Sequence, residues 1–157
     1  MAKKEIRQLQ GQDLEEALAL VWEVFAEFEA PTFTDEGIEE FWRFIDLEYM
    51  TMQVGEGAMT FWGAFEDDCL IGVCAFRGLD HISLLFVDGE YQRRGVGTML
   101  VKKAVQDCKA LDPSISAITV NSSEYGQPFY AALGFEPTGG LTVDNGIRFI
   151  PMRIEAK

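Results

Sequence analysis

A short segment rich in arginine and glycine, Gln92–Gly97, has the composition and position of a phosphate-binding turn. It lies between the apolar run Ile82–Val87 and the helix-like run Thr98–Lys109. Gly95 and Gly97 have no side chains, so a bulky anion can approach the backbone N–H groups there, and the positive end of the helix dipole adds attraction. We therefore expect a ligand that carries a di- or polyphosphate.

Two better-known phosphate-binding turns fit this segment poorly. A P-loop would place Lys and then Ser or Thr after its second glycine, and a dinucleotide-binding Rossmann turn would add a third glycine and a downstream acid. The remaining pattern, Gln/Arg-x-x-Gly-x-Gly/Ala, resembles the acetyl-CoA signature of the GNAT N-acetyltransferase superfamily. Asn121 and the run Pro128–Phe135, which contains Phe-Tyr-x-x-Leu-Gly-Phe, resemble the second half of the family's site.

The resemblance extends from about Met59 to Phe149 and implies acetyl-CoA as the cofactor. In the family, turn amides hold the pyrophosphate, and a bulge at the end of the preceding strand, matched here by Leu85–Val87, frees main-chain groups for the pantetheine arm and the acetyl carbonyl. The N–H of Val87 is the candidate oxyanion donor, and Asn121 is expected to bond the pantetheine amides or to cap the next turn. The expected cofactor-binding residues are Leu85, Phe86, Val87, Gln92, Arg93, Arg94, Gly95, Val96, Gly97, Thr98, Asn121, Phe129 and Tyr130.

Acetyl transfer to an amine requires a group that accepts the amine proton. A primary amine has a pKa near 10.4 in water, so only about one molecule in a thousand is neutral at neutral pH. His81, the single histidine, stands where some family members place a basic residue, and an ordinary pKa of about 6.5 suits a general base that acts through water. The alternatives are the carboxylates of Glu27, Glu29, Asp88 and Glu124.

Tyr130 matches the family tyrosine that faces the cofactor sulfur. A phenol can protonate the departing thiolate, whose conjugate thiol has a pKa near 8.5. The resemblance thus implies that Tyr130 is the acid and His81 the base in a direct attack within a ternary complex. No cysteine lies in a convincing nucleophile context, so a covalent acetyl-enzyme is disfavoured.

The composition suits one globular domain, residues 1–157, with 48% hydrophobic content and no linker or repeat. A net charge of −13 argues against nucleic acid or an anionic membrane as partner and fits a cationic acceptor, although solubility explains it more simply. Without an apolar leader or a spanning run, the protein is expected in the cytoplasm. Cys69, Cys74 and Cys108 are expected to be reduced buried thiols, and no metal site is expected beside one histidine.

The apolar periodicity and the resemblance together predict an α/β (α+β) domain of the GNAT type. Its sheet should be mixed and mostly antiparallel, with six to seven strands and about four flanking helices. A crossover helix should make two strands central parallel neighbours, and in the family these strands splay apart to hold the pantetheine arm. Expected strands are Glu5–Leu9, Met59–Phe65, Cys69–Arg77, His81–Val87, Ile115–Asn121 and Ile147–Ile154; expected helices run from Asp13 to near Pro31, from Thr34 to about Tyr49, over 95–109 and over Pro128–Leu133.

The acceptor is expected to be an amine-bearing small molecule rather than a protein, and the family resemblance makes a homodimer possible. Residues 1–58, which shape substrate pockets in the family, carry no motif that identifies it. Two alternatives remain. One is a non-catalytic acyl-CoA-binding or sensor module, and the other is acetylation of protein N-termini or lysines.

Overall fold

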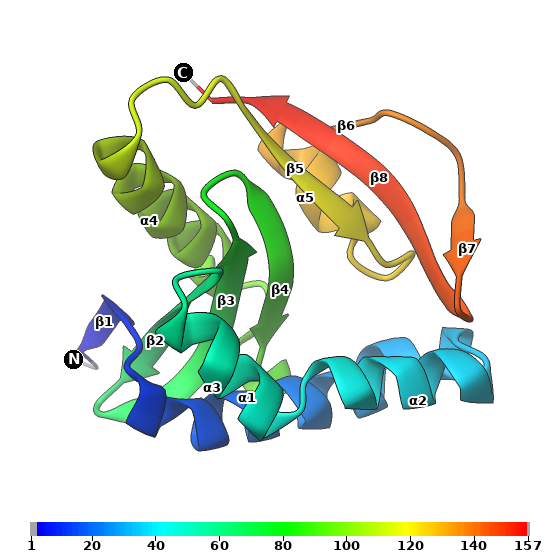
Figure 1. Ribbon diagram of the computed structural model, residues 1–157, viewed down its shortest axis with the longest axis horizontal. Coiled ribbons are helices and arrows are strands. Elements are labelled where there is room, and N and C mark those ends of the chain that lie inside the picture. The colour runs from blue at the N-terminus through cyan, green and yellow to red at the C-terminus, as the bar shows by residue number, and fades with distance from the viewer. Residues whose placement is uncertain (1–2, 157) are drawn as a thin grey trace.

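A computed structural model describes residues 3–156, which fold around one twisted sheet with helices on both faces (Figure 1). The N-terminal half supplies three of the helices, and the crossover helix covers the opposite face. In chain order the elements are β1 (Lys4–Gln8), α1 (Leu14–Val24), α2 (Asp35–Phe44), α3 (Leu47–Gly55), β2 (Met59–Glu66), β3 (Cys69–Arg77), β4 (His81–Val87), α4 (Val96–Leu111), β5 (Ala117–Ser122), α5 (Gln127–Leu133), β6 (Glu136–Pro137), β7 (Thr142–Asp144) and β8 (Ile147–Glu155).

The strand order is β1-β2-β3-β4-β5-β8-β6, and β7 pairs with β8 outside this path. Within residues 3–156, only the β4–β5 pairing is parallel, as the crossover through α4 predicts. The predicted fold class is confirmed. The described chain has eight strands and five α-helices, slightly more than expected, because β6 and β7 have only two and three residues and show no readable alternation.

The second predicted helix is divided into α2 and α3. Its apolar spacing continues across the break, but the backbone leaves the helical region at Ile45 and Asp46. The Asp46 carboxylate accepts the Tyr49 N–H at 3.0 Å and starts a new helix. The expectation of one continuous helix to about Tyr49 is therefore wrong, because a local cap outweighs the periodicity.

The two faces of the sheet have separate apolar cores. One core lies under α1 to α3 and contains Leu84 and Phe86 of β4, whereas the other lies under α4 and contains Ile82. Cys74 and Cys108 are buried free thiols, as expected. Cys69 is exposed, contrary to expectation, because it opens β3 directly after the Asp67–Asp68 turn.

A β-bulge at Ser83 explains the change of face along β4; it lies earlier in the strand than the expected position at Leu85–Val87, where the pairing with β3 is regular. Ala75 pairs with Leu84 and Phe76 with Ile82, so Ser83 has no partner on β3. An extra residue reverses the side-chain alternation beyond it. The bulge therefore sends Ile82 to one core and Leu84 to the other.

The parallel pair separates soon after it forms. Its register contains only His81 with Thr119 and Ile82 with Val120, and the ribbons of β4 and β5 then diverge (Figure 1). From Ser83 onward, β4 has no strand on that edge among the described residues. The main-chain groups on this open edge are therefore available to a ligand.

Candidate active site

The loop between β4 and α4 borders a cavity of about 680 Å³, which we call the turn cavity. All but two of the expected cofactor-binding residues line it; the exceptions are Arg94 and Asn121. The lining residues are Val24, Glu29, Leu85, Phe86, Val87, Tyr91, Gln92, Arg93, Gly95, Val96, Gly97, Thr98, Tyr125, Gly126, Pro128, Phe129 and Tyr130.

The turn has the backbone geometry of an anion site. Arg93 and Gly95 both adopt left-handed conformations, with φ of 65° and 81°, and α4 begins at Val96. The first helical hydrogen bond is donated by the Met99 N–H to the Gly95 carbonyl at 3.0 Å. The N–H groups of residues 96–98 therefore precede the helical ladder and face the end of the helix where the dipole is positive. These residues fit a pyrophosphate group.

The two glycines of the turn have different roles. Gly95 needs its freedom because of its positive φ, and a Cβ there would meet no atom within 4 Å. At Gly97, a Cβ would lie 3.1 Å from the Phe129 ring. Gly97 therefore lets α5 pack closely against α4, a role that the sequence alone did not suggest.

Side chains around the turn brace it from the protein side. The Gln92 amide donates to the Val87 carbonyl at 3.0 Å and accepts from the Tyr125 hydroxyl at 2.7 Å. The Arg94 guanidinium lies 5.4 Å from the centre of the Tyr91 ring. Tyr91 and Tyr125 could not be recognised as site residues from the sequence, because neither belongs to a recognisable motif.

The open edge of β4 supplies main-chain donors to the turn cavity. The Asp88 N–H donates to the Ile71 carbonyl on β3 at 2.9 Å. Because main-chain groups alternate in direction along an antiparallel strand, the N–H groups of Val87 and Leu85 face the other way, toward the gap between β4 and β5. Both residues line the turn cavity, so their N–H groups can reach a bound carbonyl or amide.

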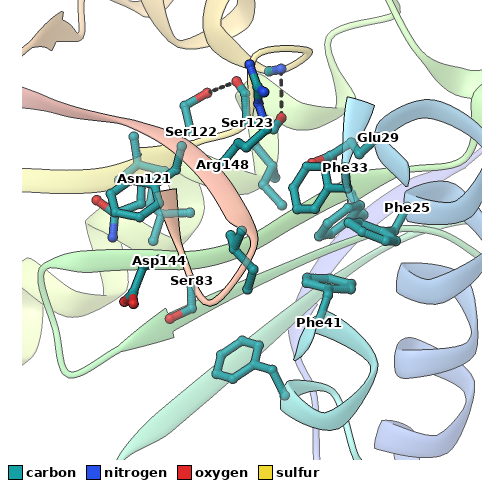
Figure 2. A pocket seen from close by; sticks show the side chains of 18 of the residues that line it. Phe25, Glu29, Phe33, Phe41, Ser83, Asn121, Ser122, Ser123, Asp144 and Arg148 are labelled. Carbon is teal, nitrogen blue, oxygen red and sulfur yellow. Dashed lines mark hydrogen bonds between the residues drawn. The ribbon is translucent and has the colours of Figure 1, made fainter. Parts of the chain in front are cut away.

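A second cavity of about 400 Å³ lies between β4, β5, the β7–β8 hairpin, α2 and the π-helical turn Phe25–Glu29 that follows α1. We call it the aromatic cavity because Phe25, Phe33, Phe41, Phe44, Phe86 and Phe149 line it. Figure 2 shows three of these rings gathered on one side, with Asn121 and Asp144 opposite them. Polar groups on its wall include Ser83, Ser122 and Ser123.

The two cavities share five lining residues, Glu29, Leu85, Phe86, Gly126 and Tyr130. Two of the five, Glu29 and Tyr130, carry groups that can transfer protons. A molecule in one cavity can therefore meet a molecule in the other between a carboxyl group and a phenol.

Glu29 has the environment of a tuned acid–base group. Burial raises its pKa from 4.5 to about 7, and a hydrogen bond from Ser123 opposes part of that rise. The Ser123 oxygen accepts the Gly126 N–H at 3.0 Å, which leaves the hydroxyl proton for the carboxyl group. Glu29 ends a π-helical turn, Phe25–Glu29, that follows α1. Such turns are rare and often occur at functional sites.

Tyr130 is buried in α5, with only 6% of its surface exposed. Burial, together with Cys74 and Glu29, holds its pKa well above the ordinary value of 10.0. The phenol is therefore protonated at neutral pH and can donate its proton. Pro128 begins α5 and Gly134, with φ of 104°, ends it, so this short helix fixes the position of the ring.

The other predicted groups lie farther from the junction. His81 lines only the aromatic cavity, its Nδ1 lies 2.8 Å from the Thr119 hydroxyl oxygen, and burial and Arg77 lower its pKa below 6.5. Asn121 also lines the aromatic cavity and not the turn cavity. Their proposed roles stay predictions.

Three alternative carboxylates are not among the residues that line either cavity. Asp88 accepts the Glu90 N–H at 2.9 Å, and Glu124 pairs with Arg148 at 2.8 Å. Glu27 is exposed on the helix surface, two residues before Glu29. Of the carboxylates named from the sequence, only Glu29 reaches both cavities.

Comparison with known proteins decides the family. The family described as "Acetyltransferase (GNAT) domain" matches residues 29–156, which is most of the chain. The chain belongs to the GNAT acetyltransferase family. The family resemblance is thereby confirmed, together with the class of enzyme, N-acetyltransferases that use acetyl-CoA.

Two individual proteins are similar to part of this GNAT chain. A UPF0039 protein of Schizosaccharomyces pombe is 30% identical over 74 residues, covering 47% of this chain and 49% of that protein. The uncharacterised N-acetyltransferase YafP of Escherichia coli is 39% identical over 56 residues, covering 36% and 33%. The chain thus matches half or less of the length of these relatives.

The fold of a solved GNAT structure agrees over nearly the whole length. PaiA N-acetyltransferase from Thermoplasma acidophilum, solved in complex with coenzyme A, superposes with a TM-score of 0.80 at 22% identity, covering 98% of this chain and 99% of that one. At this identity the likeness establishes the shared fold. Among residues 3–156, no helix combines the length and the apolar character needed to cross a membrane.

Proposed function

We propose that this protein transfers the acetyl group of acetyl-CoA to a primary amine by direct attack, with Glu29 as the general base and Tyr130 as the general acid. One observation carries the proposal: the turn cavity and the aromatic cavity meet at these two side chains. The thioester supplies an acyl group ready for transfer when the cofactor is bound. The residues of the chain hold it, polarise it and move protons around it.

The turn binds and aims the cofactor. The N–H groups of residues 96–98 hold the pyrophosphate, and the gap between β4 and β5 accepts the pantetheine arm. The Val87 N–H, on the open edge of β4, donates to the acetyl carbonyl oxygen and stabilises the charge that develops there. Asn121 acts from the aromatic cavity, on the other side of the gap.

Glu29 is better placed than His81 to accept the amine proton. An amine that enters as ammonium needs a base whose pKa lies near the working pH, and burial brings the pKa of Glu29 to about 7. Glu29 reaches both cavities, whereas His81 lines only the aromatic one. We therefore assign the base to Glu29 and retain His81 as the second candidate, acting through water.

Tyr130 protonates the departing sulfur. Its raised pKa keeps the phenol protonated at neutral pH. A proton is therefore available to the sulfur where the C–S bond breaks and the leaving group forms. No cysteine lines either cavity, which supports direct attack over a covalent acetyl-enzyme.

Thiol release from acetyl-CoA in the presence and absence of primary amines tests this function. Amine-dependent release that is lost in Glu29→Gln, with acetyl-CoA affinity retained, is the expected result. Cofactor binding without amine-dependent release would contradict catalysis and favour the sensor alternative.

A further inference from the structure

We infer that the acceptor is a small primary amine with an uncharged apolar body, enclosed beneath the β7–β8 hairpin. The inference rests on the proposed function and names its substrate class. Three features carry it: a backbone contact that holds the hairpin over the cavity, a row of aromatic rings, and the lack of a charged group in that row.

The hairpin contacts the start of α2 through two glycines, Gly146 and Gly37. Asn145 and Gly146 form its turn with φ of 52° and 79°, the pattern of a tight Asn-Gly hairpin. A Cβ on Gly37 would lie 2.2 Å from the Gly146 oxygen, and a Cβ on Gly146 would lie 2.6 Å from the Gly37 nitrogen. The two backbone segments are therefore in direct contact, and neither glycine leaves room for a side chain.

This contact closes one side of the aromatic cavity. The tip of the hairpin reaches the first turn of α2 (Figure 1), where Thr34 Oγ1 lies 3.5 Å from the Gly146 oxygen. Residues before and after the tip, Asp144 and Arg148, line the cavity. The hairpin therefore narrows the approach for a polypeptide acceptor, whereas a small molecule fits beneath it.

The aromatic row provides a surface for an apolar body. Ring centres are 5.2 Å apart for Phe33 and Phe25, 4.0 Å for Phe25 and Phe41, and 5.8 Å for Phe41 and Phe86. Glu29 lies beside the end of the row formed by Phe33 (Figure 2). An amine whose nitrogen approaches Glu29 would place its carbon chain or ring against these rings.

Two of the charged groups on the wall are paired within the protein. Glu40 is bound by Arg43 at 3.0 Å, and Arg148 is bound by Glu124 at 2.8 Å. Two others, Asp144 and Arg77, lie at exposed positions. The aromatic row itself carries no charged group, so a second charge on the acceptor that lay against the row would be removed from water without a partner, which is unfavourable.

A matched set of amines tests the substrate class. Hexylamine and 2-phenylethylamine are compared with 1,6-diaminohexane, 6-aminohexanoate and a short lysine peptide, by thiol release from acetyl-CoA. The first two should exceed the other three in kcat/KM by about tenfold or more, the cost of an unpaired buried charge. A diamine, amino acid or peptide that equals or exceeds hexylamine would overturn the inference while leaving amine acetylation in place. Absence of release with every amine would overturn the proposed function itself.

A glycine substitution tests the enclosure. Gly37→Ala adds a methyl group that favours α2 but collides with Gly146, so it should displace the hairpin without weakening the helix. The expected result is a KM for hexylamine raised about fivefold or more, a smaller preference over the peptide, and an unchanged KM for acetyl-CoA. Gly140→Ala is the control, because a Cβ there meets nothing within 4 Å. Unchanged hexylamine KM and unchanged preference in folded Gly37→Ala protein would overturn the inference.

Discussion

The turn cavity and the aromatic cavity adjoin each other but are built differently. The turn cavity depends on main-chain groups that follow one another closely in the sequence, at the end of β4 and the start of α4. The aromatic cavity depends on side chains that come from the π-helical turn after α1 and from α2, β4, β5 and the β7–β8 hairpin. The first uses backbone geometry, and the second uses tertiary packing.

This difference explains what each cavity can recognise. Backbone N–H groups at a helix start bind any pyrophosphate in the same way, so the turn cavity serves a cofactor common to a whole family. Side chains can be exchanged without changing the fold, so the aromatic cavity can suit one acceptor. Substitutions in the two regions should therefore have separable kinetic effects.

The largest kinetic effect is expected at Tyr130, which lines both cavities. Tyr130→Phe removes the proton donor for the departing sulfur and should lower kcat by about 100-fold or more, because general acid catalysis contributes on that scale. The KM for acetyl-CoA should change little, since the ring and its packing remain. Steady-state thiol release measures both constants.

Tyr49→Phe is the matched control, because Tyr49 lies exposed on α3. An equal loss of kcat and of cofactor affinity in Tyr130→Phe would show that the phenol holds the cofactor instead of protonating it. No loss in either would remove it from the mechanism.

On the cofactor side, Gly95→Ala should raise the KM for acetyl-CoA by about tenfold. A residue with a Cβ at φ of 81° costs about 1–2 kcal/mol, and the turn would relax away from the geometry that points its N–H groups at phosphate. The KM for the amine should stay the same. A change in the amine KM alone would contradict the division between the two cavities.

On the acceptor side, Phe33→Leu should raise the KM for an apolar amine by about fivefold and leave the KM for acetyl-CoA unchanged. The substitution shortens the aromatic row beside Glu29 but retains an apolar side chain in the partly buried position. Initial-rate measurements with both substrates varied distinguish the two constants. An effect on the cofactor constant would show that the cavities are not independent.

The smallest effect concerns stability. Because the pKa of Glu29 is raised from 4.5 to about 7, the native state keeps a proton that the unfolded state releases in this range. The free energy of unfolding should therefore fall as the pH rises from 4.5 to 7 and then level off. Glu29→Gln should remove most of this fall, measured by urea unfolding at several pH values.

Glu27→Gln is the control for the stability measurement, since Glu27 is exposed on the same helical turn. An identical pH dependence in wild type and Glu29→Gln would show that the Glu29 carboxyl group is solvated. It would then also lack the tuned pKa that the proposed base requires.

Much of the fold and of the cofactor site could be predicted from the sequence. The phosphate turn is encoded within six consecutive residues, Gln92–Gly97, and the strand before it and the helix after it have clear periodicity. The sequence could not show that Gly97 accommodates Phe129 or that Ser83 forms the bulge. Both depend on contacts with residues distant in the chain.

The acceptor side was harder to predict because it is assembled from separate segments. Glu29 was one of several carboxylates, and only its burial between two cavities distinguishes it. A usable signal did exist: Glu29 follows the buried Phe25 by one helical turn, so a carboxylate falls on the side that continues the apolar face of α1. The hairpin over the cavity was not predicted although Asn145-Gly146 is a turn signal, because β7 has only three residues and shows no readable alternation.

The pH dependence of kcat/KM, calculated for the neutral amine, tests the central claim most directly. With the ionisation of the acceptor removed in this way, the account predicts that wild-type kcat/KM falls about tenfold per pH unit below pH 7 and that Glu27→Gln behaves the same. Glu29→Gln should be slow at every pH and should lack this inflection. An inflection near pH 7 that persists in Glu29→Gln and disappears in His81→Asn would contradict the account and assign the base to His81.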